Sequence, residues 1–417
     1  MTTSTKSAAK PKAATASACD LILAHNAGRE PERLAIKYQR MHEDAFAFLR
    51  ATPGLFYQRL VTTGLAPAGP PAWSSGDLHL ENCGTYLGAN GLVYFDINDY
   101  DAALLAPLGW DILRLTTSLL IAAPSLNLKR SQAIDLAGRL VEAYRGELLG
   151  GKARWVERST AGGLIGDLMR GLKRRDPNAF LDGRTKTVKG ERTLIIDGKR
   201  MLPLDAKAKL SLKAWVKTLE KGPGDGVGFE LLDAGRRVAG VSSLGTARYA
   251  LLVQVHGGAG GIRLLELKSA QPSATAPYAP CHQPAWSSEA ERIVELQKRC
   301  QAVSPGMWRA LSFEGAPFVL RELQPSQDRL DLSAAAKTLP AFGESLATMA
   351  GLSAWAQLRS SGRQGSATAD ELIGCASSAA AFKPMLDVAK AMEELVQADW
   401  REFCADYAAG RFSQLRS

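Results

Sequence analysis

The sequence is poor in the residues on which metal-centred and disulfide-linked folds depend. Only five His and six Cys occur in 417 residues, and no two Cys form a C-x-x-C pair. This spacing indicates neither a zinc site nor a disulfide framework, and scattered single cysteines are typical of a reducing cytoplasm. No segment approaches the run of about 18 apolar residues that a membrane-spanning helix requires. We therefore expect a cytoplasmic protein with no membrane partner.

Acidic residues are outnumbered, and the basic surplus is spread along the chain. There are 51 Lys and Arg against 42 Asp and Glu, which gives a formal net charge of +9. Such a surplus favours anionic ligands such as nucleotide phosphates. The densest basic stretch, residues 169–175, is explained most simply as a solvated helix end, and no aromatic–basic module accompanies it. Nucleic acid is therefore not an expected partner.

The first residues differ in composition from the rest of the chain. Residues 1–19 are rich in Ala, Ser, Thr and Lys and lack the apolar segment of a secretory signal, so they are predicted to be a disordered tail. The remaining length and an apolar fraction of 46% are sufficient for two lobes.

Two acidic motifs stand close together in the first quarter of the chain. The first is Gly76-Asp77-Leu78-His79-Leu80-Glu81-Asn82, and the second follows an apolar run and places Asp96 fourteen residues after Asn82. Phosphoryl transfer needs one carboxylate to accept a hydroxyl proton and hard oxygen ligands for Mg²⁺. We assign the first role to Asp77 and the second to Asn82 and Asp96, and we expect His79 to brace the loop.

Two other interpretations of the first motif are open. An Asp and an Asn in a turn commonly bond backbone amides and do nothing else. A G-D-x-H start also occurs in metallophosphoesterases, but a two-metal site needs more His ligands than this chain offers, and no downstream G-N-H follows.

The motif G-D-x-H-x-x-N resembles the catalytic loop of protein-kinase-like enzymes, in particular the aminoglycoside-phosphotransferase-like branch. The resemblance puts Asp96 at the position of the second metal-binding Asp. It also likens Asp111, on the next predicted helix, to an Asp that bonds the catalytic-loop backbone, although a first-turn Asp favoured by the helix dipole explains Asp111 equally well. Asp99 and Asp101 are further candidates for touching metal or substrate, but neither matches the kinase pattern closely.

Longer stretches extend the resemblance. The segments "GDLHLENCG", "YFDINDYDAALLAPLGWDILRLTTS" and "RVAGVSSLGTARYALLV" are similar to a bacterial family known as domain of unknown function 2252, from about Glu32 to the C-terminus. That family is grouped with kinase-like folds, so the resemblance implies such a fold here.

A predicted strand region carries a second set of candidate residues. Gly240-x-Ser242-x-x-Gly245 lies between two predicted strands, and a Lys lies on the next strand. A Gly-containing hairpin lets backbone amides close over phosphates, and a following Lys grips them. The helix after these strands should offer Lys268 a Glu, and Glu289 is favoured over Glu291 and Glu295 because it lies beside the apolar stripe. The expected nucleotide-binding residues are Gly240, Ser242, Ser243, Gly245, Lys268 and Glu289.

These motifs combine into one expectation, an α+β, two-lobed, protein-kinase-like fold. The Gly-containing hairpin follows the catalytic loop, whereas it precedes that loop in ordinary kinases, so a circular permutation with neighbouring chain ends is expected. The predicted organisation is a helical lobe from residues 20–185 and 331–417 and a strand lobe from 186–330. The expected activity is transfer of a phosphoryl group from ATP, with Mg²⁺, to a hydroxyl of an unidentified small molecule or protein. The alternatives are AMP transfer and non-catalytic nucleotide binding by a pseudokinase.

Overall fold

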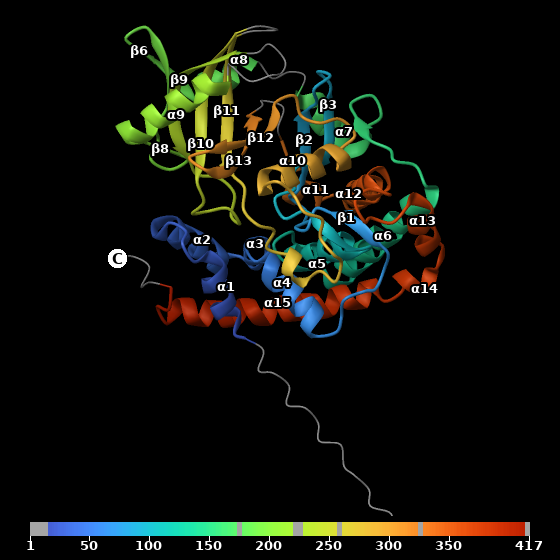
Figure 1. Cartoon of the computed structure of the whole chain (residues 1–417). Coiled ribbons are helices and arrows are strands. Elements are labelled where there is room, and N and C mark those ends of the chain that lie inside the picture. The colour runs from blue at the N-terminus through green and yellow to red at the C-terminus, as the bar shows by residue number, and fades with distance from the viewer. Residues whose placement is uncertain (1–15, 173–176, 220–227, 257–260, 324–327, 413–417) are drawn as a thin grey trace, which may run out of the picture.

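The computed structural model describes residues 16–172, 177–219, 228–256, 261–323 and 328–412. The chain is an α+β protein in which a six-stranded sheet stands beside a larger, mostly helical part (Figure 1). Most of the predicted tail lies outside the described residues, but its last residues are ordered, because Ser17 caps a helix that begins at Ala18. Within the described ranges, no helix combines the length and apolarity needed to cross a membrane.

The helical part is built from both ends of the chain. Its first half contains α1 (Ala18–Asn26), α2 (Pro31–Glu43), α3 (Ala45–Ala51), α4 (Pro53–Thr62), α5 (Trp110–Ala122), α6 (Arg130–Gly150) and α7 (Gly163–Leu172). Its second half contains α11 (Leu332–Ala335), α12 (Leu339–Ser360), α13 (Ala369–Ser377), α14 (Ala379–Phe382) and α15 (Met385–Ala408).

Helix α15 runs along the first helices and joins the two halves (Figure 1). Arg59 of α4 donates to both carboxylate oxygens of Asp399, with Nε 3.0 Å from Oδ2 and Nη2 2.9 Å from Oδ1. Arg411, just after α15, donates to Asp20 of α1 at 2.5 Å. The expected proximity of the two chain ends therefore holds for the described residues.

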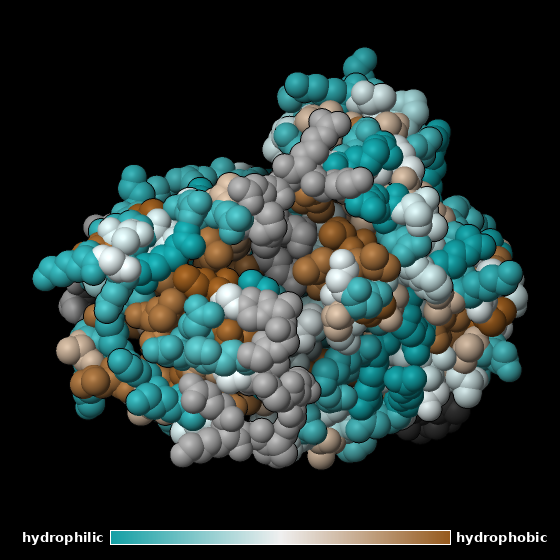
Figure 2. Space-filling model, turned by 90° about the horizontal axis from the view of Figure 1, so that it is seen from above, coloured by the Kyte–Doolittle hydropathy of each residue, from teal (hydrophilic) through white to brown (hydrophobic). Residues whose placement is uncertain are grey.

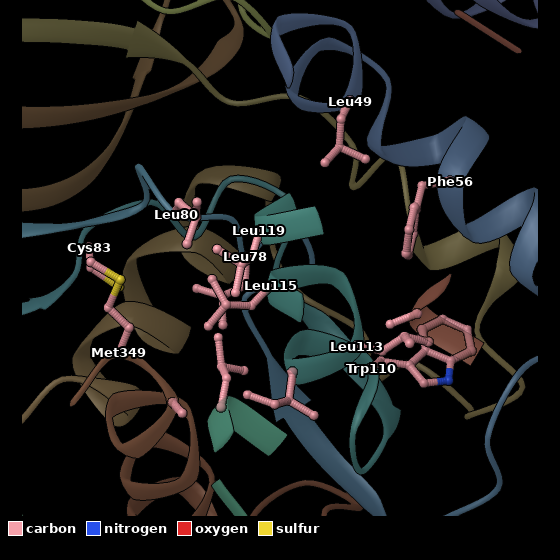
Figure 3. Close-up of a cluster of buried hydrophobic side chains, with 14 of the residues drawn as sticks. Leu49, Phe56, Leu78, Leu80, Cys83, Trp110, Leu113, Leu115, Leu119 and Met349 are labelled. Atoms are coloured by element: carbon pink, nitrogen blue, oxygen red, sulfur yellow. The ribbon is translucent and has the colours of Figure 1, made fainter. Parts of the chain in front are cut away.

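Two small sheets hold the acidic motifs within the helical part. β1 (Pro71–Ser74) pairs with β4 (Leu104–Pro107), and β3 (Val93–Ile97) pairs with β2 (Cys83–Leu87) and β5 (Val156–Glu157). The first acidic motif connects β1 to β2. Its Leu78 and Leu80 are buried and point into the main apolar core, near Leu115 and Leu119 of α5 (Figure 3). Burial of these two leucines anchors the loop and leaves its polar residues at the core boundary.

The larger sheet is antiparallel and has the order β12-β13-β11-β10-β9-β8. Its strands are β8 (Met201–Leu202), β9 (Gly228–Arg237), β10 (Arg248–His256), β11 (Gly261–Ser269), β12 (Trp308–Phe313) and β13 (Ala316–Glu322). Helix α9 (Ala206–Leu219) packs on one face, where its Leu212 and Val216 share a core with Phe229 and Leu251. Helix α10 (Glu289–Cys300) connects β11 to β12 and packs between the sheet and α12.

A helix α8 (Pro177–Asp182) and a hairpin of β6 (Thr185–Val188) and β7 (Glu191–Leu194) lie at the outer end of this sheet (Figure 1). Seen from above, the rim of the molecule is mainly hydrophilic, and hydrophobic side chains gather in the hollows toward the middle of the view (Figure 2). On this face, hydrophobic side chains therefore occupy recessed positions, and hydrophilic side chains occupy the most exposed ones.

Candidate active site

A cavity of about 780 Å³ is bordered by residues of both the helical part and the six-stranded sheet. The helical part contributes residues 21, 22 and 24–29, residues 51–55 and the carboxylates of Asp77, Asp99 and Asp101. The sheet contributes the turn between β9 and β10 and the end of β11 with the segment after it. Asp77 of the first acidic motif, Asp99 and Asp101 after β3, and the Gly-containing turn more than 130 residues later therefore border one cavity.

The backbone of the first acidic motif has a fixed shape at its start. Gly76 has a φ of +77°, and a Cβ there would collide with the carbonyl oxygen of Ala102, so only glycine fits. Asp111, in the first turn of α5, accepts from the amide of Ser75 at 2.7 Å and from the amide of Gly76 at 3.1 Å. Of the two interpretations of Asp111, the bond to the loop backbone is therefore the one that the structure contains.

Asp77 lies in the cavity wall and is held by a residue that the sequence analysis missed. Arg114 of α5 donates from Nε to Asp77 Oδ1 at 2.9 Å, and its Nη2 bonds the same oxygen and the carbonyl of Leu49. Its guanidinium lies 4.8 Å from the ring centre of Phe56. The spacing from Asp111 could have predicted this contact, because a residue three positions after Asp111 lies on the same side of the helix and therefore also faces the loop.

Burial governs the charge of this carboxyl group. It raises the pKa of Asp77 to about 6, although Arg114 acts in the opposite direction. A carboxylate with such a pKa is ionised near neutral pH and is a better proton acceptor than an ordinary Asp.

His79 and Asn82 brace the loop. The ring of His79 accepts from the amide of Glu81 at 3.2 Å and lies edge-on to Phe46, and burial lowers its pKa well below the ordinary range. The side-chain amide of Asn82 donates to the backbone carbonyl of Asp77. Asn82 is buried and does not line the cavity, so its observed contact is structural.

The prediction for Asp96 needs correction. Asp96 lies within β3 opposite Gly84, and its carboxylate accepts from the amide of Ile97 at 2.8 Å and from the backbone of Ala302. It does not line the cavity. The physical reason is strand alternation, which turns this side chain into the helical part, where burial raises its pKa to about 6.

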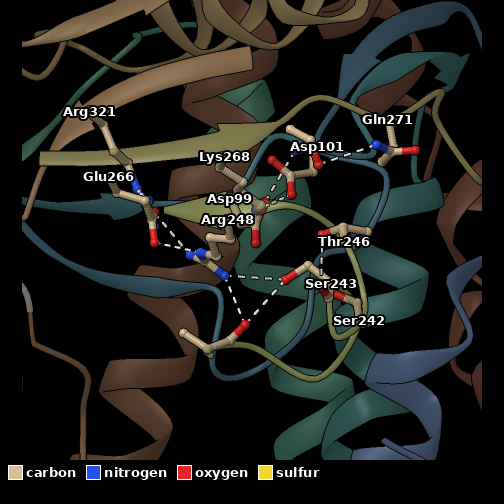
Figure 4. Close-up of polar contacts among 12 residues, drawn as sticks. Asp99, Asp101, Ser242, Ser243, Thr246, Arg248, Glu266, Lys268, Gln271 and Arg321 are labelled. Atoms are coloured by element: carbon tan, nitrogen blue, oxygen red, sulfur yellow. Dashed lines mark hydrogen bonds and ion pairs between the residues drawn. The ribbon is translucent and has the colours of Figure 1, made fainter. Parts of the chain in front are cut away.

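The carboxylates that do reach the cavity follow the end of β3. Asp99 accepts from the amide of Asp101 at 3.1 Å, and Lys268 forms an ion pair with Asp101 (Figure 4). Burial opposes ionisation of Asp99, but Lys268, the amide of Asp101 and the nearby Arg321 and Arg248 together outweigh it, so the pKa of Asp99 lies below its ordinary value. Two neighbouring carboxylates match the one or two that Mg²⁺ takes from protein beside a nucleotide. The described residues contain no group of three or more His, Cys, Asp or Glu suited to a metal.

The predicted pairing of Lys268 with Glu289 is wrong. Glu289 binds Arg292, three residues later in α10, at 2.6 Å. Arg292 also donates to the carbonyls of Ala103 at 2.6 Å and Asp101 at 2.7 Å. An i,i+3 partner on the same helix satisfies Glu289 locally, and α10 reaches the acidic segment through Arg292 instead.

The Gly-containing turn between β9 and β10 borders the cavity with Ser242, Ser243 and Gly245, whereas Gly240 does not line it. Both glycines have positive φ, +77° and +87°. A Cβ on Gly245 would come within 2.8 Å of the Cβ of Arg29, so the turn sits tightly against the start of α2.

Next to Lys268, the same sheet face carries a cluster of arginines (Figure 4). Arg237, Arg248 and Arg321 all bind the buried carboxylate of Glu266, with Arg248 Nη2 at 3.0 Å and Arg321 Nε at 2.6 Å. Strand register places Arg248 opposite Lys268 and Arg321 opposite Glu266. One carboxylate thus faces three guanidinium groups, and the face has a net positive charge.

One protein-family model matches the chain. It covers residues 29–406 and describes its members as uncharacterized proteins conserved in bacteria, DUF2252. No curated protein and no solved structure matches the chain. Because the matched range is most of the 417 residues, the family suggested by the acidic motifs is confirmed. The chain belongs to the DUF2252 family.

Proposed function

We propose that the protein is an ATP- and Mg²⁺-dependent phosphotransferase that acts on a hydroxyl group of a small molecule or protein. The observation that carries this proposal is the convergence of Asp77, Asp99 and Lys268 on one cavity of about 780 Å³ beside a Gly-containing turn. A carboxylate base, oxygen ligands for a hard cation and a phosphate-binding Lys are the groups that phosphoryl transfer requires. The unpaired state of all six cysteines is consistent with the cytoplasmic location that we include in the proposal.

The proposal includes a kinase-like fold in permuted order. In protein kinases, a Gly-rich loop precedes the strand with the phosphate-pairing Lys, and a helix follows that strand. Here the turn after β9, Lys268 on β11 and helix α10 occur in the same succession. The segment with Asp77 precedes them in sequence, and α15 closes the helical part from the other end, which supports permutation.

Each residue has a defined task in this proposal. Asp77 accepts the proton of the attacking hydroxyl, and Arg114 fixes the orientation of its carboxylate. Asp99 and Asp101 hold Mg²⁺, and they replace Asp96 as the metal-binding carboxylates. Lys268 exchanges Asp101 for phosphate oxygens as the ligand enters. Bound Mg-ATP supplies the phosphoryl group and neutralises charge on it.

AMP transfer is the second candidate, and one observation favours it. The arginines around Glu266 continue the positive charge of Lys268 along the sheet. If the β and γ phosphates of ATP extend along this face, the α phosphorus lies next to Asp77. Attack there transfers AMP, and the leaving group is pyrophosphate.

Product analysis tests the proposal. The full-length protein is incubated with Mg²⁺, a bacterial metabolite extract and ATP labelled at the α or the γ phosphorus. Release of ADP with transfer of the γ label supports phosphotransfer, whereas pyrophosphate with transfer of the α label supports AMP transfer. Binding of Mg-ATP without turnover indicates a pseudokinase, and absence of binding overturns the proposal.

A further inference from the structure

The turn between α1 and α2 docks on the Gly-containing turn of the sheet. The amide of Glu30 donates to the carbonyl of Gly245 at 3.3 Å, and the Glu30 carboxylate pairs with Arg236 of β9. Figure 1 shows α1 and α2 directly beneath the six-stranded sheet. Helix α1 and the turn that follows it, up to Arg29, therefore contribute a wall of the cavity next to the proposed phosphate site.

Two cations of this segment point at the same backbone carbonyl. Arg29 Nη1 donates to the carbonyl of Ser242 at 2.6 Å, and Lys37 Nζ lies 3.3 Å from that oxygen. Lys37 also donates to Asn26 Oδ1 at 2.7 Å. Arg29, Asn26 and Ser242 line the cavity, whereas Lys37 is buried directly behind Asn26 and Ser242 and does not border it.

Neither cation has an acidic partner within the described part of the chain. Lys37 is fully buried, and Arg29 is half-buried. Within the described ranges, no carboxylate oxygen lies within 4.0 Å of the Arg29 guanidinium or of the Lys37 amine. A buried cation bonded only to neutral oxygens is costly, because such groups do not replace hydration or a counter-ion.

Nearby charges deepen this imbalance. Burial, together with Arg29, lowers the pKa of Lys37 well below the ordinary lysine range, and Asp77 is the one acidic group that counteracts it noticeably. An anion that binds beside Arg29 and Lys37 would favour the charged form of Lys37, so binding would be accompanied by uptake of a proton from solvent by the Lys37 amine.

We propose that Arg29 and Lys37 form an anion subsite that binds a phosphate group at the edge of the cavity, beside Ser242. The inference rests on the proposed function and extends it, because it assigns phosphate binding to residues of the first helices in addition to Lys268. The phosphate belongs either to the nucleotide or to a phosphorylated acceptor, and the shared chemistry is a phosphate oxygen held by one Lys and one Arg.

Three variants of the full-length protein test the subsite. Lys37→Met keeps the length of the side chain and removes its charge, and Arg29→Gln removes the second cation without a fully buried change. Lys213→Met alters an exposed Lys of α9 and is the matched control. Calorimetry and thermal melting use inorganic phosphate, tripolyphosphate and Mg-ATP as probes.

We expect Lys37→Met and Arg29→Gln each to weaken phosphate or tripolyphosphate binding by about ten- to hundredfold, as expected for loss of one charge-assisted bond, with Lys213→Met unchanged. If the phosphate is that of the nucleotide, affinity for Mg-ATP falls in parallel and affinity for adenosine does not change. If it is that of an acceptor, inorganic phosphate binds to protein saturated with Mg-ATP, and both variants lose this second binding event.

The inference is overturned if the wild-type protein binds none of these anions. It is also overturned if both variants keep wild-type affinities while Lys37→Met lowers the melting temperature of the ligand-free protein. Lys37 would then stabilise the fold without binding the anion. The two proposals fail separately. Turnover of ATP with unchanged affinities in both variants refutes the subsite alone, whereas Lys37-dependent binding of tripolyphosphate without ATP binding refutes the proposed function alone.

Discussion

Arg114 Nε donates to Asp77 Oδ1 at 2.9 Å, and its Nη2 bonds the same oxygen. No described residue forms a hydrogen bond to Asp77 Oδ2, although the side chain lines the cavity and is 16% exposed. One carboxylate oxygen is therefore anchored, and the other is available to a substrate hydroxyl. Because α5 also holds the loop backbone through Asp111, a single helix sets both the position and the orientation of the proposed base.

Asp77→Asn tests the role of this oxygen as proton acceptor. A positioned general base typically contributes about 10²–10⁴-fold in rate, so turnover should fall by that factor while Mg-ATP affinity persists. Calorimetry and ATP consumption on the same preparation measure the two quantities. A parallel loss of affinity and rate would mean that Asp77 only maintains the loop.

Substitution of Arg114 separates positioning from folding. Arg114→Met removes the cation beside Asp77, which raises the pKa of the carboxyl group further and moves the acid limb of the rate profile to higher pH. Arg114→Lys keeps the positive charge, so the acid limb should return toward its wild-type pH. The rate should recover less, because Lys lacks the planar guanidinium that orients the carboxylate. If both variants lose activity with an unshifted limb and a lower melting temperature, Arg114 acts through stability alone.

The wild-type protein should show its own acid limb. A base works only when deprotonated, and the pKa of Asp77 in the folded protein is about 6, so kcat/KM should rise with pH through about 6 and level off above it. Asp96 has a similar pKa but lies outside the cavity, which makes Asp96→Asn the control. The acid limb should persist in Asp96→Asn. If the limb disappears in that variant, it reports the titration of Asp96 and not that of Asp77.

The sequence was informative where local chemistry decides the structure. The requirement for glycine at position 76 follows from backbone sterics, and the burial of Leu78 and Leu80 follows from their apolar side chains. The bond from Asp111 to the loop was one of two open possibilities, because a first-turn Asp is satisfied equally well by its own helix.

Local chemistry could not decide contacts between distant segments. Choosing among Asp96, Asp99 and Asp101 depends on the residue at which β3 ends, and strand ends are poorly determined by pattern. Lys268 pairs with a carboxylate in the opposite part of the molecule, whereas Glu289 pairs with a guanidinium, that of Arg292, in its own helix. Residues 29 and 37 approach the Gly-containing turn across more than 200 positions, a contact that no spacing rule reports.

The choice between Asp96 and Asp99 is itself a sharp prediction about Mg²⁺. Asp99→Asn removes a hard oxygen ligand from a cavity that offers two, so affinity for Mg-ATP should fall by about tenfold or more, while affinity for metal-free ATP changes little. Asp96→Asn alters a carboxylate already bonded to the amide of Ile97 and should leave both affinities near their wild-type values. Titrations with and without Mg²⁺ compare the two variants directly. If Asp96→Asn weakens only the metal-dependent binding, the sequence-based assignment was right, and the cavity must rearrange on binding to bring Asp96 in.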